Sequence, residues 1–403
     1  MTSRSRATAA AAFLTVLGAG ILGHAAWGGG RGGRPALRTF QTPYYILYTD
    51  LGEADAREAD LRLTRMFEEY QQRTAGFAGA VRAKFPFYLY RNKEDYYAAG
   101  GPAKSAGVYI ESRDGKKLMA IAGDHTSDGT WRVIQHEGFH QFVAATIPHE
   151  LPVWANEGLA EYFGEAIWTG DGFVTGLIPP ERLTLVKTAI QNSRFKSFKQ
   201  LLAMTDDDWI KSLDPLDYTE SWAMIHFLAH ADNGKYRGPF LQFMKLVSGG
   251  NPGPIAWVNV FGQDTTAFEK RFAAWWMDLP ENPTRQGYMQ AVVQAQASFL
   301  ARAFLQKQTY PTAEVFFKTF KPAALTVNRD LWLPPALFEE TSDAAQHVGT
   351  WTLEASANQL PKLICVEADG TKYTGSFTIN NGRVGKVGVQ ITPGADAQAA
   401  PSR

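Results

Sequence analysis

His136-Glu137-Gly138-Phe139-His140 reads H-E-x-x-H and lies within a segment whose apolar residues recur at helical spacing. Two histidines four residues apart project from one face of a helix, so both imidazoles can bind one metal ion. The glutamate between them is then placed to activate a water molecule. The stretch therefore predicts a helix that carries a metal site, with the rest of the fold built around it.

A third metal ligand is expected from a second acidic motif, Asn156-Glu157-Gly158. Sixteen residues separate His140 from Glu157, and the pattern over residues 153–163 is again helical. A short loop returns the second helix antiparallel to the first, which can place the carboxylate against the two imidazoles. Hydrolytic zinc sites take three protein ligands and leave one position for water. We therefore expect Zn²⁺ to be bound by His136, His140 and Glu157.

These two motifs together resemble those of the gluzincin metallopeptidases, the thermolysin-like and alanyl-aminopeptidase-like clan. Residues 151–163 are similar to a bacterial branch of the peptidase MA-like superfamily, many of whose members are domains of unknown function. Residues 218–222 resemble the tyrosine-bearing helix of the same clan, and the resemblance covers roughly residues 44–230. It implies a thermolysin-like catalytic core in which Glu137 is the base and Tyr218 donates to the oxyanion.

The implied activity is metal-assisted hydrolysis of a peptide or protein substrate. Glu137 would take a proton from water and pass it to the leaving amine. The Gly-x-Met-Glu-Asn element by which alanyl-aminopeptidase relatives hold the substrate amine is absent, so we expect an endopeptidase. The strand predicted at residues 117–122 is expected to be the sheet edge to which an extended peptide adds.

An alternative keeps the fold without the hydrolysis. The chain would then be a binding or assembly protein of the cell envelope, with the C-terminal β region as its contact surface. The intact ligands disfavour this hypothesis, because a degenerate site is expected to lose Glu137 first. A serine or cysteine hydrolase has little support, since there is no Gly-x-Ser-x-Gly motif and Cys365 lies in a predicted strand far from the motif histidines.

Other polar residues have simpler interpretations. Glu161 lies one turn beyond Glu157, where it either orients a ligand histidine or is solvated. Three further polar clusters are expected to be structural, namely the loop pair His149 and Glu150, the helix pair His226 and His230, and the helix-start carboxylates Asp206, Asp207 and Asp208.

The composition is that of a globular protein of 403 residues, 45% hydrophobic and 20% charged. Lys plus Arg and Asp plus Glu both total 40, and this balance gives no support for nucleic acid or an anionic membrane as a partner. One cysteine excludes a disulfide framework and a cysteine-based zinc site. No segment after the N-terminal region is apolar enough to span a bilayer, so we expect no membrane span in the mature chain. The oligomeric state has no signature in the sequence.

Residues 1–26 are expected to be a signal peptide. Arg4 and Arg6 precede a run of small apolar residues, and either Gly23-His24-Ala25 or His24-Ala25-Ala26 offers a cleavage site. The alternative is an uncleaved N-terminal anchor. In either case we expect an exported protein, secreted or periplasmic.

The order of the predicted elements favours an α+β fold. Strands in the first third of the chain are expected to form a mixed sheet, a helix-rich half follows, and a small all-β module ends the chain. Predicted boundaries after the signal are a linker at 27–38, the metallopeptidase domain at 39–282, a helical extension at 283–330, the β module at 331–393 and a disordered tail at 394–403.

Overall fold

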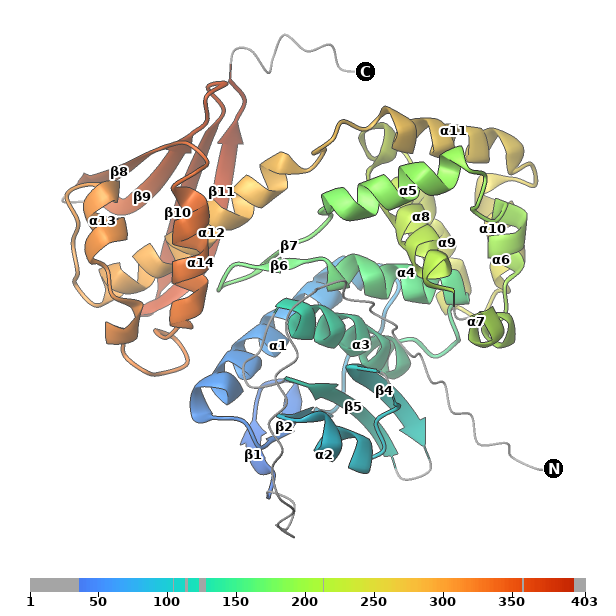
Figure 1. Cartoon of the computed structure of the whole chain (residues 1–403), viewed down its shortest axis with the longest axis horizontal. Coiled ribbons are helices and arrows are strands. Elements are labelled where there is room, and N and C mark those ends of the chain that lie inside the picture. Colours follow the sequence, from blue (N-terminus) through green and yellow to red (C-terminus); the bar gives the residue numbers. More distant parts are fainter. Residues whose placement is uncertain are drawn as a thin grey trace, which may run out of the picture.

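The computed structural model describes residues 36–103, 105–112, 115–122, 128–212, 214–356 and 359–394. The expected signal peptide, most of the expected linker and all but the first residue of the expected tail lie outside the described residues. Figure 1 shows an N-terminal sheet with helices over it, a helical half, and a C-terminal sheet with helices of its own. The predicted α+β class is confirmed.

The N-terminal sheet is mixed, as predicted, with the strand order β1-β2-β3-β5-β4. β2, β3 and β5 run parallel, whereas β1 and β4 are antiparallel to their neighbours. Pro86 lies opposite Ile46 of β2, and the pairing of β3 with β5 begins only at Phe87. The strands are β1 Arg38–Gln41, β2 Tyr45–Thr49, β3 Phe85–Tyr90, β4 Gly107–Ser112 and β5 Gly115–Ile121.

The strand predicted as the open edge, residues 117–122, is not at the edge. β5 pairs with β3 on one side and with β4 on the other. Because β3 occupies one side of β5, the hairpin partner β4 can pair only on the opposite side and becomes the outermost strand. In the described part of the sheet, the open edge beside the H-E-x-x-H helix is therefore β4.

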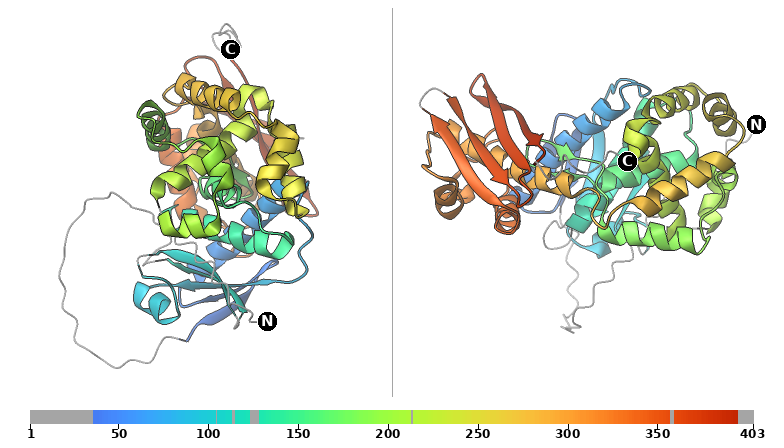
Figure 2. Two further views of the ribbon diagram at one scale, coloured as in Figure 1. Left: turned by 90° about the vertical axis from the view of Figure 1, so that its right-hand side faces the viewer. Right: turned by 90° about the horizontal axis from the view of Figure 1, so that it is seen from above.

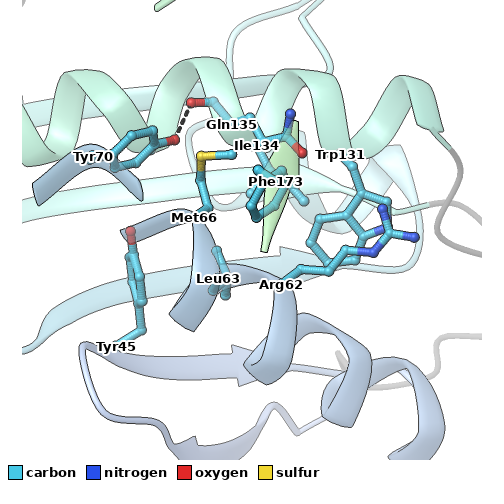
Figure 3. Close-up of a pocket in the computed structure, with 10 residues that line it drawn as sticks. Tyr45, Arg62, Leu63, Met66, Tyr70, Trp131, Ile134, Gln135 and Phe173 are labelled. Atoms are coloured by element: carbon cyan, nitrogen blue, oxygen red, sulfur yellow. Dashed lines mark hydrogen bonds between the residues drawn. The ribbon is translucent and has the colours of Figure 1, made fainter. Parts of the chain in front are cut away.

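One face of this sheet is covered by helices α1 and α3, while the short α2 packs elsewhere on the sheet. Leu63 and Met66 of α1 face α3, and the Tyr70 hydroxyl donates a hydrogen bond to the main-chain carbonyl of Gln135 (Figure 3). The packing leaves a void of only about 10 Å³, close to the space of one water molecule. The helices are α1 Glu53–Thr74, α2 Lys93–Ala98 and α3 Asp128–Thr146.

The glycine inside H-E-x-x-H permits this close packing. A Cβ atom at Gly138 would lie 3.3 Å from the Tyr70 hydroxyl oxygen and 3.9 Å from that of Tyr45. Glycine costs a helix about 1 kcal/mol relative to alanine. A side chain at this position would crowd the Tyr70 hydroxyl, which donates to the main chain of α3, so glycine suits this close approach.

The helical half surrounds one central helix, α4. Every residue of α4 except Asn156 is buried, and the helix packs against α3 on one side and α8 on the other. A helix that is apolar on all sides belongs in a core. The helices here are α4 Val153–Gly164, α5 Pro180–Gln191, α6 Phe198–Ala203, α7 Asp206–Ser212, α8 Pro215–Gly234, α9 Arg237–Ser248, α10 Gly253–Phe261 and α11 Thr266–Asp278.

The C-terminal strands form a sheet, as predicted. It is fully antiparallel, with the order β11-β10-β9-β8. Figure 2 shows α12 lying along one face of this sheet, where Val293 and Ala297 pack on Gly375. Helix α14 lies within the same region, so helices accompany the strands. The elements are α12 Arg285–Leu305, α13 Ala313–Thr319, α14 Pro335–Ala345, β8 Thr350–Ser356, β9 Gln359–Val366, β10 Lys372–Asn380 and β11 Arg383–Thr392.

A short hairpin connects the two parts of the molecule. Strands β6 (Ile167–Trp168) and β7 (Phe173–Val174) carry Asp171 at their turn, which accepts hydrogen bonds from Nη1 and Nη2 of Arg302 on α12 at 2.7 and 2.9 Å. The two side chains are 3% and 4% exposed.

None of the helices in the described ranges combines the length and the apolar character needed to cross a bilayer.

Gly158→Ala should destabilise the protein by about 1–3 kcal/mol, the usual cost of overpacking a core. A Cβ at Gly158 would lie 2.5 Å from the main-chain oxygen of Ser221, so α8 must move away from α4. Urea unfolding measures the change. Gly238→Ala on α9 is the matched control, because its Cβ meets nothing within 4 Å and it should be neutral or slightly stabilising. Equal stability of the two variants would contradict the close-contact argument.

Candidate metal centre

Helices α3 and α4 bring the three expected ligands together in the core. His136 Nε2 and His140 Nε2 are 3.1 Å apart, and each lies 3.4 Å from Glu157 Oε2. All three residues are buried. Because α4 returns antiparallel after a short loop, Glu157 in its second turn faces both histidines. This group could hold a metal ion.

The outer nitrogen of each imidazole has its own acceptor. Nδ1 of His140 lies 3.3 Å from Oδ1 of Asn156, and Nδ1 of His136 lies 3.1 Å from Oε1 of Glu161. Such partners hold the proton on Nδ1 and direct the Nε2 lone pair to the opposite side of the ring. Glu161 thus lies where it orients a ligand histidine, the first of its two sequence interpretations.

With both imidazoles neutral, three electron-pair donors converge with no proton between them. Glu157 Oε2 is buried and has no hydrogen-bond partner in the described structure. Three ligands about 2.0–2.1 Å from one tetrahedral zinc ion lie roughly 3.3–3.4 Å apart, close to the observed 3.1, 3.4 and 3.4 Å. The donor set and its spacing therefore fit zinc.

The electrostatic field of the site favours positive charge. Burial alone would lower the pKa of His136, but Glu157 and Glu161 on opposite sides of the ring outweigh it and raise that pKa to about 10. Burial likewise opposes ionisation of Glu157, yet His140 and His136 hold its pKa at about 2. A cation is therefore stabilised at this point, and a metal that binds there displaces a proton.

Glu137 lies between the metal ligands and the edge of the sheet. Its Oε2 accepts a hydrogen bond of 2.8 Å from the main-chain N–H of Tyr109 on β4. Its Oε1 is buried and has no hydrogen-bond partner in the described structure. Burial raises the pKa of Glu137. One oxygen is thus fixed by the scaffold while the other is available to bind a proton.

Tyr218 lies near the expected ligands, at the start of α8. Asp214 caps this helix by accepting from Leu216 N at 2.9 Å, which sets where the tyrosine emerges. The Tyr218 ring lies 6.4 Å from the His136 ring and packs edge-on against Trp209. Burial, then the charge of Glu157, raises the pKa of Tyr218, so its hydroxyl remains a donor near neutral pH.

Sequence reasoning missed a chain of ion pairs behind His136. Glu161 pairs with Arg182 of α5, and Arg182 Nε also lies 2.7 Å from Oε1 of Glu165. Arg132 of α3 pairs with the same Glu165. Burial opposes the charge of Glu161, but Arg182 and His136 hold its pKa far below the usual range. No motif signals Arg182, because its partners come from another helix.

The remaining polar clusters lie away from the ligands. His226 and His230 are in an aromatic cluster, where Tyr162 contacts His230 Nε2 at 3.0 Å and burial lowers the pKa of both histidines. Helix α7 begins at Asp206, as expected for helix-start carboxylates. His149 and Glu150 are exposed in the α3–α4 loop and border an open groove.

Glu220, two residues after Tyr218, should make stability depend on pH. Burial raises its pKa to about 8, with Lys196 opposing the shift. The folded state therefore holds this proton more tightly than the unfolded chain, and stability falls as pH rises from about 4.5 to about 8, by at most about 1.4 kcal/mol per pH unit.

Glu220→Gln should remove that loss, so its advantage in urea unfolding over the original protein grows from about pH 5 to pH 8. Glu339→Gln, at an exposed carboxyl on α14, is the control and should follow the original protein throughout. A constant difference between Glu220→Gln and the original protein across this range would contradict the prediction.

A protein-family profile described as a protein of unknown function, DUF1570, matches residues 131–252. The match spans α3 to α9 and contains all five expected site residues, but not β4 or the C-terminal sheet. No curated protein matches the chain. The expected similarity to domains of unknown function is thus confirmed, and the gluzincin resemblance stays a prediction.

Proposed function

We propose that this chain is an exported zinc-dependent peptidase of gluzincin type, with a thermolysin-like core, that cleaves peptide bonds within a chain. The observation that carries the proposal is the convergence of two imidazole nitrogens and one carboxylate oxygen, 3.1–3.4 Å apart, beside a buried carboxylate that takes no part in the ligand set. One oxygen of Glu137 accepts from Tyr109 N–H, but its other oxygen is buried without a hydrogen-bond partner in the described structure, which a purely structural metal site would not require. Export rests on the N-terminal sequence alone.

Each group beside the ligands has a chemical task. Bound zinc supplies the Lewis acid that polarises a carbonyl and makes water nucleophilic near neutral pH. Glu137, held through one oxygen by Tyr109 N–H, takes the proton of the attacking water on its other oxygen and delivers it to the leaving amine. Tyr218 donates its hydroxyl to the oxygen on which negative charge develops.

The substrate would lie along β4. Ile121 N bonds to Ala106 O, so the alternation of antiparallel pairing turns the main-chain groups of Gly107, Tyr109 and Glu111 away from β5. The N–H of Tyr109 donates to Glu137. The Tyr109 carbonyl and the main-chain groups of Gly107 and Glu111 are then the ones that would pair with an added peptide strand. This arrangement suits an extended, unfolded segment of a protein.

The purified protein should bind about one zinc ion per chain at neutral pH, where the ligands can deprotonate. Glu137→Gln should keep that zinc but lose about 10²–10⁴-fold in hydrolysis of a mixture of unstructured peptides, because it removes the proton carrier. Metal analysis and mass spectrometry of the digest measure the two effects, and Glu339→Gln is the control for both.

A chelator should abolish the hydrolysis, and added zinc should restore it. A protein that binds no zinc would overturn the proposal. The envelope-binding alternative would be favoured if the original protein binds zinc but cuts nothing, or if the Glu137→Gln variant cuts as well as the original protein.

Tyr218→Phe should lower kcat by about 10²–10³-fold with little change in zinc content, as expected for the loss of one oxyanion donor. The aromatic packing on Trp209 is kept in this variant, so it should fold, with a stability loss of about 0.5–1.5 kcal/mol for the lost hydroxyl contact. Steady-state kinetics with a peptide found in the digest measure the effect. An unchanged kcat would remove Tyr218 from the mechanism and leave it as a packing residue.

A further inference from the structure

We propose that Arg182 is a positioning residue of the metal centre, which fixes Glu161 and through it the His136 ligand. The inference rests on the proposed metal site and concerns a residue outside its ligands, base and oxyanion donor. Arg182 enters from α5, which contributes none of those groups. Its side chain is 13% exposed, so its contacts are almost entirely with protein.

The guanidinium bridges two carboxylates at the end of α4. Glu161 and Glu165 are one turn apart on the helix, where two like charges repel. Arg182 pairs with Oε2 of Glu161 and lies 2.7 Å from Oε1 of Glu165 through Nε. A planar fork can bind two acceptors at once, whereas a lysine offers one point charge. Arginine at this position therefore sets the distance and direction between the two carboxylates.

Both carboxylates that Arg182 bridges also contact α3, the helix that carries His136: Glu161 contacts His136, and Glu165 contacts Arg132. Glu165 also pairs with Arg132, which lies one turn before His136 on α3. On the opposite side, the guanidinium carbon lies 4.9 Å from the ring centre of Trp222 on α8. Contacts with both carboxylates at the end of α4 and with Trp222 of α8 thus leave Arg182 little freedom to move away from Glu161.

Both oxygens of Glu161 are used in this arrangement. Oε1 contacts Nδ1 of His136 and Oε2 contacts Arg182. If Arg182 were removed, Glu161 could rotate, and the rotation would turn the His136 ring or leave its Nδ1 without a partner. His140 has no equivalent dependence, because its partner Asn156 is a neutral amide. The metal centre is therefore asymmetric, with one ligand tied to a buried ion chain and the other to an amide.

The test compares Arg182→Met, Arg182→Lys and Arg132→Met in the full chain. Arg132→Met is the matched control, since it removes the other cation of Glu165 and leaves Glu161, Arg182 and His136 in contact. The zinc dissociation constant is measured by competition with a chelator, and urea unfolding of the metal-free protein is measured in parallel. The visible absorption spectrum of the Co²⁺-substituted protein reports the ligand geometry directly.

Arg182→Met should weaken zinc binding by about 10–100-fold, the usual effect of removing a group that orients a ligand. Arg182→Lys should recover part of the lost zinc affinity. It keeps a positive charge opposite the two carboxylates, so it should fold even if the methionine variant does not. Arg132→Met should bind zinc within about threefold of the original protein and keep its Co²⁺ spectrum, whatever its stability.

Two outcomes would overturn the inference without touching the proposed function. One is that both Arg182 variants bind zinc as tightly as Arg132→Met. The other is an unchanged Co²⁺ spectrum in both Arg182 variants, which would make the ion chain purely a matter of stability. Failure of the original protein to bind zinc is a different result, because it removes the proposed function and this inference together.

Discussion

The packing of α4 between α3 and α8 is the constraint on which the site depends. Glu157 meets the two histidines only because α4 lies close against α3, and Tyr218 is near them only because α8 lies close against α4. Gly158 permits the second contact, since any Cβ would collide with the main chain of Ser221. The helix that carries Glu157 is therefore also the most buried helix of the core, so a change that loosens its packing would also disturb the site.

The centre also combines a large number of charges with very little solvent. Glu137, Glu157 and Glu161 are all buried, and isolated carboxylates in such surroundings would be protonated or would unfold the protein. The histidines, the Tyr109 N–H and Arg182 compensate them from different elements. The low pKa values of Glu157 and Glu161 thus depend on groups from α3 and α5, and not on α4 alone.

Local spacing was enough to predict which three side chains converge in the core, and much of the fold. His136 and His140 follow from a four-residue interval on one helix, and Glu157 follows from a short loop between two helices. The order of β4 and β5 could not be predicted in the same way, because either strand could pair with β3 without any change in the hydrophobic pattern. Arg182 was missed for a related reason. Its partners are set by where α5 packs, and one arginine in a helix carries no information about that.

The hairpin between β6 and β7 has a consequence for how the molecule can be divided. Asp171 is held in the interior mainly by Arg302, while Arg65 of α1 lies 3.8 Å from its Oδ1. Breaking a buried ion pair by removing one partner typically costs about 3–5 kcal/mol, and here Arg65 would offset part of that cost. The hairpin begins at Ile167, two residues after Glu165, which belongs to the ion chain behind His136. Removing α12 and the C-terminal sheet would therefore leave the buried Asp171 of the hairpin without its main partner. Loss of α12 and the sheet would disturb the end of α4, the helix that carries Glu157.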